Sequence, residues 1–378
     1  MKIIQKKFSY ENGWEILRDD NFDVSLCNFV LVFGSRQLLD TDLIFETVSK
    51  EYTNAVILLN STAGEIIDTQ VNDNSVSLTA MYFEKTELMP VTGHIDDFKN
   101  SYEAGKKLAE KLDKKNLRNV FVISDGQKVN GSDLVAGLHD CLPAETIITG
   151  GLAGDGALFK KTLVGLNENP VEGRIAIIGF YGNDLLVTHG SIGGWDPFGP
   201  KRLITKSNEN VLYELDGEPA LDIYKLYLGD YSNELPGSGL LFPLCLYTES
   251  NNSLVRTILS VSEEAKSLTF AGNMPEGSFV RLMKANFDRL IEGASAAAQI
   301  SMRDKKHQPD LAILISCVGR KLVLNQRIEE EIEVIRETYG EKTALTGFYS
   351  YGEISPGTDS VKCELHNQTM TITTFTEN

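Results

Sequence analysis

The chain has 378 residues and a formal net charge of −17 at pH 7. This length is sufficient for two or three domains, each with a sizeable core. The acidic balance excludes the basic footprint that nucleic acids and anionic membrane surfaces require, so we expect neither as a partner.

The cysteines and the N-terminus indicate the compartment. The five cysteines are scattered, odd in number and without the spacing of a metal site, which is typical of a reducing cytosol. The five histidines show no paired spacing for zinc, so we expect no metal. The N-terminus lacks the apolar segment of a secretory signal, and no apolar run approaches about eighteen residues. We therefore expect a soluble cytoplasmic protein.

Three stretches of the chain share one strand–helix–strand pattern. Each opens with an apolar strand that ends near a serine, the first of them at residues 29–33. Each closes with a second strand and a glycine turn that ends in a carboxylate: Glu65, Asp155 or Glu353. An internal repeat of this kind predicts one structural unit used three times. We expect the serine-ended strands to be central and buried, with the glycine turns at the ends of sheets.

The stretch between residues 190 and 240 is punctuated by glycine and proline and marks a domain boundary. We expect two related lobes, residues 1–220 and 221–378. The predicted fold class is α/β with mixed sheets built from repeated strand–helix–strand units. Strands interleaved with helices favour parallel pairing, while a closing hairpin around Asn367 and Gln368 requires antiparallel pairing.

Six strings of sequence occur in order along the chain: residues 61–66, 150–155, 210–217, 316–320, 347–354 and 364–371. Taken together, they resemble the FIST family, a bacterial sensory module with an N-terminal and a C-terminal part. The resemblance covers the chain from about residue 28 to its end. The first 28 residues depart from the family, which usually carries a longer Ala-rich helix before its first strand.

The resemblance implies a FIST N-terminal domain at residues 1–220 and a FIST C-terminal domain at residues 221–378. It implies a cytoplasmic, non-enzymatic sensor of an amino acid or a similar small polar metabolite. Signal transduction would pass through a separate partner: a histidine kinase of a two-component system, a chemotaxis protein or a cyclic-di-GMP signalling protein. Part of the family resembles haem-binding nitric-oxide sensors, so a haem protein with His189 as ligand is one alternative. A cysteine- or carboxylate-dependent enzyme is another.

The candidate ligand site consists of the glycine turns and the end of the third serine-ended strand. Glycine tolerates positive φ and lets a ligand approach the backbone, but it also simply lets a strand turn into the next element. We expect residues 316–320 and 349–353 to face one cleft at strand ends. The candidate ligand-binding residues are Ser61, Thr62, Gly64, Glu65, Gly150, Gly151, Gly154, Asp155, Ser316, Cys317, Gly319, Arg320, Tyr349, Ser350, Tyr351, Gly352 and Glu353.

Charges at this site fit a zwitterion. Arg320 could bind a carboxylate, and a carboxylate after a glycine turn could bind an ammonium group. Arg320 could equally pair with Glu353 and never contact a ligand. Cys317 lies between a strand end and a helix start, which can lower a thiol pKa, but a buried cysteine also behaves as a small hydrophobic residue. We expect no bound cofactor, with haem as the alternative.

Overall fold

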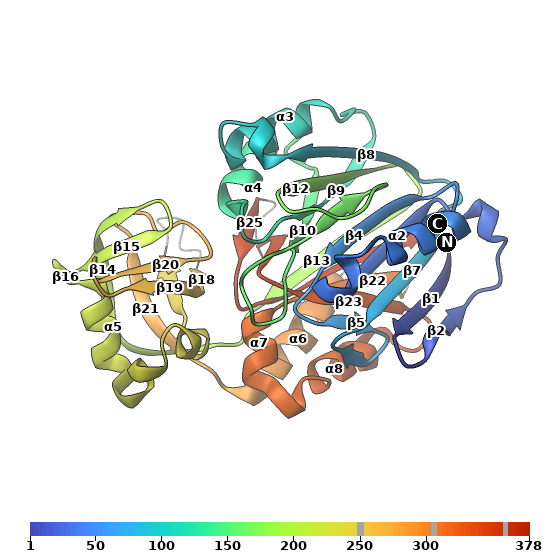
Figure 1. The fold of residues 1–378 in the computed structure, drawn as a ribbon. Helices are drawn as coiled ribbons and strands as arrows, with labels where there is room; N and C mark the ends of the chain where they lie inside the picture. Colours follow the sequence, from blue (N-terminus) through green and yellow to red (C-terminus); the bar gives the residue numbers. More distant parts are fainter. Residues whose placement is uncertain (248–252, 304–307, 358–361) are drawn as a thin grey trace.

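The computed structural model describes residues 1–247, 253–303, 308–357 and 362–378. Figure 1 shows a large body, in which the two termini lie close together, and a small lobe at one side of it, formed by residues 196–284. Three six-stranded mixed sheets form the body. The predicted α/β class with mixed sheets is confirmed.

The three body sheets follow one plan: a central parallel pair, antiparallel strands on one side, and a strand from another repeat on the other. The first sheet contains β11 (Val164–Leu166), β4 (Val56–Ser61), β3 (Phe29–Gly34), β7 (Val76–Tyr82), β1 (Lys2–Ser9) and β2 (Gly13–Asp19). The second contains β25 (Cys363–His366), β24 (Gly352–Pro356), β10 (Ile147–Leu152), β9 (Leu117–Ser124), β12 (Arg174–Tyr181) and β8 (Glu87–His94). The third contains β13 (Leu185–Ile192), β26 (Met370–Glu377), β22 (Leu311–Cys317), β23 (Ala344–Ser350), β5 (Glu65–Ile67) and β6 (Gln70–Asn72).

The central parallel pairs are the three predicted repeats: β3–β4, β9–β10 and β22–β23. Val122 in β9 is fully buried and Ile313 in β22 is 1% exposed, which confirms that the serine-ended strands are central and buried. The connecting helices are α1 (Arg36–Leu39) and α2 (Asp42–Glu51) in the first repeat, α4 (Gly131–His139) in the second, and α7 (Val318–Leu324) and α8 (Glu330–Tyr339) in the third.

After each repeat, the next strand of the chain pairs with a strand in the sheet of another repeat. β5 follows the first repeat and pairs with β23 of the third, while β24 follows the third and pairs with β10 of the second. β11 follows the second repeat and pairs with β4 of the first, which closes the cycle. The body sheets therefore draw strands from both residues 1–220 and residues 221–378, and the division at residue 220 stays a prediction about sequence units.

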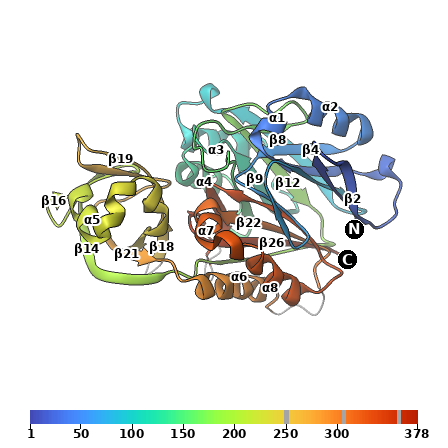
Figure 2. The ribbon, with the colours of Figure 1, turned by 60° about the horizontal axis from the view of Figure 1, so that its bottom comes forward.

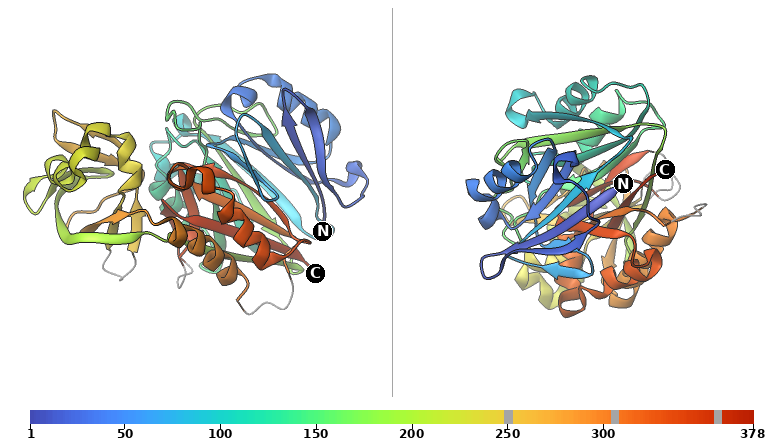
Figure 3. Two further views of the ribbon diagram at one scale, coloured as in Figure 1. Left: turned by 90° about the horizontal axis from the view of Figure 1, so that it is seen from below. Right: turned by 90° about the vertical axis from the view of Figure 1, so that its right-hand side faces the viewer.

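Apolar side chains of the three sheets meet at the centre of the body. Phe33, Phe121 and Phe348, one from each sheet, belong to the same buried cluster, and the Phe33 and Phe348 rings lie 4.9 Å apart. The helices cover the outer faces: α3 (Ser101–Glu110) and α4 lie over the second sheet, and α6 (Phe287–Ser301) and α8 lie over the third (Figures 1 and 3).

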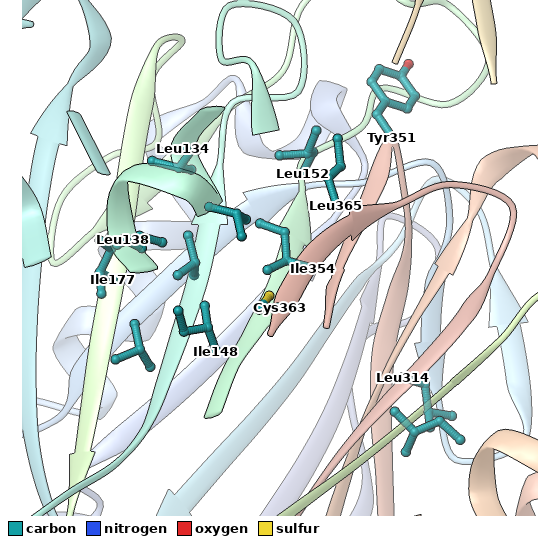
Figure 4. Close-up of a cluster of buried hydrophobic side chains, with 14 of the residues drawn as sticks. Leu134, Leu138, Ile148, Leu152, Ile177, Leu314, Tyr351, Ile354, Cys363 and Leu365 are labelled. Carbon is teal, nitrogen blue, oxygen red and sulfur yellow. The ribbon is translucent and has the colours of Figure 1, made fainter. Parts of the chain in front are cut away.

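Leu134 and Leu138 of α4 belong to one buried apolar cluster with Ile148 and Leu365 of the second sheet, and Tyr351 lies at one end of this cluster (Figure 4).

The small lobe has its own eight-stranded antiparallel sheet and its own core, which includes Leu212, Tyr224 and Phe270 (Figure 2). Its sequence is inserted between β13 and α6. Its elements are β14 (Asp196–Asn208), β15 (Val211–Leu215), β16 (Glu218–Pro219), α5 (Ala220–Leu228), the 3-10 helices η3 (Gly229–Glu234) and η4 (Gly237–Leu241), β17 (Leu244–Tyr247), β18 (Ser253–Arg256), β19 (Ile258–Ser262), β20 (Ser267–Phe270) and β21 (Phe279–Lys284).

The predicted C-terminal hairpin around Asn367 and Gln368 is wrong. β25 pairs with β24 in the second sheet, whereas β26 pairs with β22 and β13 in the third. The two residues therefore carry the chain from one sheet to another. The same crossing occurs in the first repeat between β6 and β7, at Asp73 and Asn74. None of the helices that the structure describes is long and apolar enough to cross a membrane.

Candidate functional site

The three glycine turns meet where the three sheets come together. We call residues 61–65 the first turn, 150–155 the second and 349–353 the third. Each turn donates a backbone N–H group to a carbonyl of another, so the three form a closed ring. These bonds run from Ala63 N to Tyr349 O (2.8 Å), from Gly154 N to Ser61 O (2.9 Å) and from Tyr351 N to Leu152 O (3.2 Å).

The first turn ends in a buried carboxyl group. Glu65 is 1% exposed, and its two oxygens accept hydrogen bonds from the Thr62 hydroxyl (2.6 Å) and the Ser75 hydroxyl (2.7 Å). Burial raises the pKa of Glu65 to about 7, although the two hydroxyl groups act in the opposite direction. Glu65 can therefore gain or lose a proton near neutral pH.

A cavity of about 260 Å³ lies beside Glu65, and we call it the Glu65 cavity. The first turn, the start of α1 and Asp155 line it. At the start of α1, the Ser35 hydroxyl and the Arg36 Nε are buried and have no hydrogen-bond partner among the residues that the structure describes. Arg36 Nε lies 3.9 Å from an Asp155 carboxylate oxygen. The cavity thus presents both signs of charge and has donors left unused.

Lys321 of α7 lies next to this cavity and contacts two residues that line it, Ala63 and Asp73. Its ammonium group donates to the carbonyl of Ala63 (2.9 Å) and forms an ion pair with Asp73. Gly64 has a φ of +141°, and a Cβ there would lie 2.5 Å from the Lys321 Nζ. A side chain at this position would displace the Lys321 ammonium group, and it would also strain a backbone with positive φ. A second cavity of about 520 Å³ lies against Lys321 and shares Ala63 and Asp73 with the first.

The carboxylate of Asp155 in the second turn accepts three hydrogen bonds. One carboxylate oxygen accepts the backbone N–H groups of Lys160 (3.1 Å) and Lys161 (2.9 Å), and the other accepts the Tyr351 hydroxyl. The Tyr351 oxygen in turn accepts the N–H groups of Asp155 and Phe159, both at 3.1 Å. Tyr351 therefore fixes the second turn to the third, and burial raises its pKa.

The third turn repeats the arrangement at Glu65. The fully buried Glu353 accepts the Ser350 hydroxyl (2.6 Å) at one oxygen. The other oxygen accepts the N–H group (3.2 Å) and the hydroxyl (2.9 Å) of Thr369. Burial raises the pKa of Glu353 to about 8. Thr62 and Ser75 thus correspond to Ser350 and Thr369.

Arg320 does not face a cleft, which corrects its predicted role as a ligand for a carboxylate. Its guanidinium group is fully buried and forms an ion pair with Glu331 of α8, in which Nε (3.1 Å) and Nη2 (2.8 Å) donate to the same carboxylate oxygen. The remaining donors bind the carbonyls of Leu290 (2.7 Å) and Gly193. The alternative pairing with Glu353 is also wrong, because Glu331 is the partner.

Ser316, Cys317 and Tyr349 belong to the same buried region. The hydroxyl groups of Ser316 (3.2 Å) and Tyr349 (2.6 Å) donate to Glu331. Burial raises the pKa of the Cys317 thiol. This corrects the idea of a lowered thiol pKa, because loss of solvation outweighs any effect of the helix start.

The other predicted site residues serve contacts between segments. Gly150 has a φ of +145°, and a Cβ there would lie 1.8 Å from the carbonyl oxygen of Val122. The Ser61 hydroxyl accepts the N–H group of Leu163 (2.8 Å). Side chains or backbone of other turns and of the β25–β26 crossing lie against the remaining glycines: Gly151, Gly154, Gly319 and Gly352. Of the seventeen candidates, Thr62, Gly64, Glu65 and Asp155 line the Glu65 cavity.

Sequence reasoning missed the cations around this cavity, and it missed Glu331. Arg36 directly follows the serine at the end of the first apolar strand, so the repeat pattern itself could have pointed to it. Lys321 is the neighbour of Arg320, which was taken as the binding cation. Glu331 lies three residues after Ile328, on the apolar face of its helix, where a charged residue needs a partner.

Comparison with known proteins shows that two family models match this chain. The family model of the FIST N domain matches residues 28–218, and that of the FIST C domain matches residues 220–356. An uncharacterised protein of Methanocaldococcus jannaschii is 26% identical over 238 residues, which cover 54% of this chain and 44% of that protein. The chain therefore spans less than half the length of this relative.

Proposed function

The chain belongs to the FIST family, whose domains are associated with sensing in signal transduction, and from this premise we propose that it senses a small zwitterionic ligand in the Glu65 cavity. An amino acid or a similar small polar metabolite is the chemical class that fits. The observation that carries the proposal is that Arg36, Glu65 and Asp155 line one cavity with donors to spare.

The two ends of a zwitterion find opposite partners there. A ligand carboxylate would accept from the unpaired Nε of Arg36 and from the unpaired hydroxyl of Ser35. A ligand ammonium group would lie against Glu65 and Asp155, and its charge would favour the ionised form of Glu65. Neither ligand charge would then be buried alone, which is the costly situation for an ion inside a protein.

The output side of the proposal follows from the family alone. A cytoplasmic sensor of this kind would act without catalysis on a separate histidine kinase, chemotaxis protein or cyclic-di-GMP signalling protein. The raised pKa of the buried Cys317 argues against an enzyme that uses this thiol. Haem remains the cofactor alternative. His189, its proposed ligand, lies in β13 opposite Thr373 and lines neither cavity next to Lys321.

The test is a thermal-shift screen against the amino acids, followed by calorimetric titration of each one that stabilises the protein. Binding to the native state raises the apparent melting temperature. Arg36→Met should weaken binding of such a ligand at least tenfold and leave the fold intact. Arg202→Met is the matched control, because Arg202 is a surface arginine of the small lobe paired with Asp216. Unchanged affinity in a folded Arg36→Met protein would contradict the proposal.

A further inference from the structure

The small lobe covers the β25–β26 crossing at Asn367 and Gln368. The next residue, Thr369, binds Glu353 of the third turn. The side-chain amide of Gln368 donates to the carbonyl of Leu240 in η4 of the lobe (3.3 Å). The backbone carbonyl of Gln368 accepts the indole N–H of Trp195, the residue just before the lobe begins (2.8 Å). In Figure 2 the lobe lies beside the body next to α7. Gln368 is fully buried as a result.

The covered crossing at Gln368 occupies the same position in the third repeat as Asn74, which lines the Glu65 cavity, occupies in the first. Asn74 and Gln368 both adopt positive φ, +55° and +62°, and each stands one residue before the hydroxyl residue that binds the turn carboxyl group. Asn74 lines the Glu65 cavity, whereas Gln368 lies beneath the lobe. The structure thus holds two versions of one site, an open version and a covered version.

The covered version contains polar groups without partners. Asn367 is fully buried, and neither its amide nitrogen nor its amide oxygen has a hydrogen-bond partner among the described residues. The amide oxygen of Gln368 likewise finds none in the described part of the chain. Buried polar groups in native proteins are nearly always paired, so this concentration of unused donors and acceptors calls for a missing partner.

We propose that Asn367 and Gln368 form a second ligand site, which takes a small primary carboxamide and is closed by the small lobe. A carboxamide offers an N–H₂ group and a carbonyl side by side, so it can form a cyclic pair of hydrogen bonds with the Asn367 amide. Its second N–H can reach the Gln368 oxygen. A carboxylate of the same shape lacks N–H donors, so it would leave the amide oxygens of Asn367 and Gln368 without partners.

Access to this site requires the lobe to move relative to the body. The chain crosses between them twice, at Trp195 and just after β21, and side chains bridge the junction. Asn130 of the body donates to Asn273 of the lobe (3.0 Å), and Arg256 of the lobe donates to the Leu365 carbonyl (2.7 Å). Trp195 stands at one crossing and contacts Gln368, so its fluorescence reports on both the motion and the site.

The experiment uses the full chain with Trp14→Phe, which leaves Trp195 as the single tryptophan. Its emission is followed during titration with L-glutamine and L-asparagine, and separately with L-glutamate and L-aspartate. We expect a saturable change with at least one amide, and at least tenfold weaker binding of the matching acid. The response should persist with Arg36→Met added, which separates this site from the Glu65 cavity. No saturable response to either amide would overturn the proposal, as would loss of the response with Arg36→Met.

A stability measurement excludes a purely structural role. Asn367→Leu should abolish the fluorescence response and also raise the melting temperature, because it removes a buried amide that has nothing to bind. The matched control is Asn119→Leu: Asn119 is equally buried but donates to the Ile147 carbonyl (2.8 Å), so this change should lower the melting temperature. A response that survives Asn367→Leu, or a lowered melting temperature in that variant, would show that no ligand binds this amide.

Discussion

The first and third turns each bury a glutamate carboxyl group that accepts hydrogen bonds from two hydroxyl residues. Glu65 of the first turn lines a cavity, whereas the crossing that binds Glu353 of the third turn is bonded to the small lobe. The backbone does not cause this difference, because the flanking residues Asn74 and Gln368 share the same positive φ. What differs is the neighbouring structure. At the third turn, η4 of the inserted lobe bonds to Gln368 and closes the space. An insertion far along the chain therefore decides which copy of a repeated site is open.

The two arginines that follow the opening strands differ in the same way. Arg36 comes after β3, and its side chain is 23% exposed at the rim of the Glu65 cavity. Arg320 comes after β22 and is fully buried, with Glu331 as its ion-pair partner. Under the proposed function, Arg36 would serve ligand binding in the first repeat, whereas Arg320 serves stability in the third. The predictions below test this contrast between the first and third turns, starting with the largest effect.

Arg320→Met should destabilise the protein far more than Arg36→Met. Removing one partner of a buried ion pair typically costs about 3–5 kcal/mol, because the other charge is left unpaired. At Arg320 the orphaned group is Glu331. At Arg36, which is partly exposed, we expect a cost below about 1 kcal/mol. Urea unfolding of both variants measures the difference in the free energy of unfolding. Equal effects would remove the distinction between a binding arginine and a structural one.

The sequence predicted the fold through its repeats. The apolar strands and glycine turns recur with similar spacing, and the structure turns them into three parallel pairs with buried central strands. The sequence could not predict that β5, β24 and β11 each pair in the sheet of another repeat. Short strands of three to five residues carry little hydrophobic pattern of their own. The wrong hairpin at Asn367 has this cause, since a turn sequence does not say that its two strands join different sheets.

The site was predicted only in part. The carboxylates at the glycine turns were identified, but their depth of burial depends on strands and helices from other repeats. Arg320 shows the limit most clearly: its partner Glu331 is supplied by α8, and nothing next to Arg320 in the sequence reveals this. The cation at the open cavity is Arg36, which only the assembled ring of turns brings near Asp155.

The pH dependence of the free energy of unfolding should reveal the titration of Glu353. Its folded pKa of about 8 lies above its usual value of 4.5, so the protonated form favours the folded state. This contribution is fully present below about pH 4.5 and is lost as the pH rises through about 8. Glu353→Gln keeps an uncharged amide in place and removes the titration. We expect this variant to gain a few kcal/mol relative to the unmodified protein between pH 5 and 9, on the scale of about 1.4 kcal/mol per pH unit.

Urea unfolding at a series of pH values measures this gain, and Glu84→Gln, a change at an exposed carboxylate, is the control. Parallel pH profiles for Glu353→Gln and the unmodified protein would mean that Glu353 titrates as it does in the unfolded chain. Glu65→Gln should show the same trend over a narrower range, because the folded pKa of Glu65 is about 7.

The smallest effect separates the open turn from the covered one. Thr62→Val and Ser350→Ala each remove a hydroxyl group that stabilises the ionised form of the turn carboxylate. A lost hydrogen bond of about 1 kcal/mol corresponds to a rise in pKa of about 0.7. Beside the Glu65 cavity a water molecule can replace the missing hydroxyl, whereas at Glu353 the lobe leaves less room. Carboxyl ¹³C NMR titration should therefore show a larger rise for Glu353 in Ser350→Ala than for Glu65 in Thr62→Val. With Thr62→Ser as the control that restores the hydroxyl, an equal rise at both carboxyl groups would indicate that the two turns are equally closed to water.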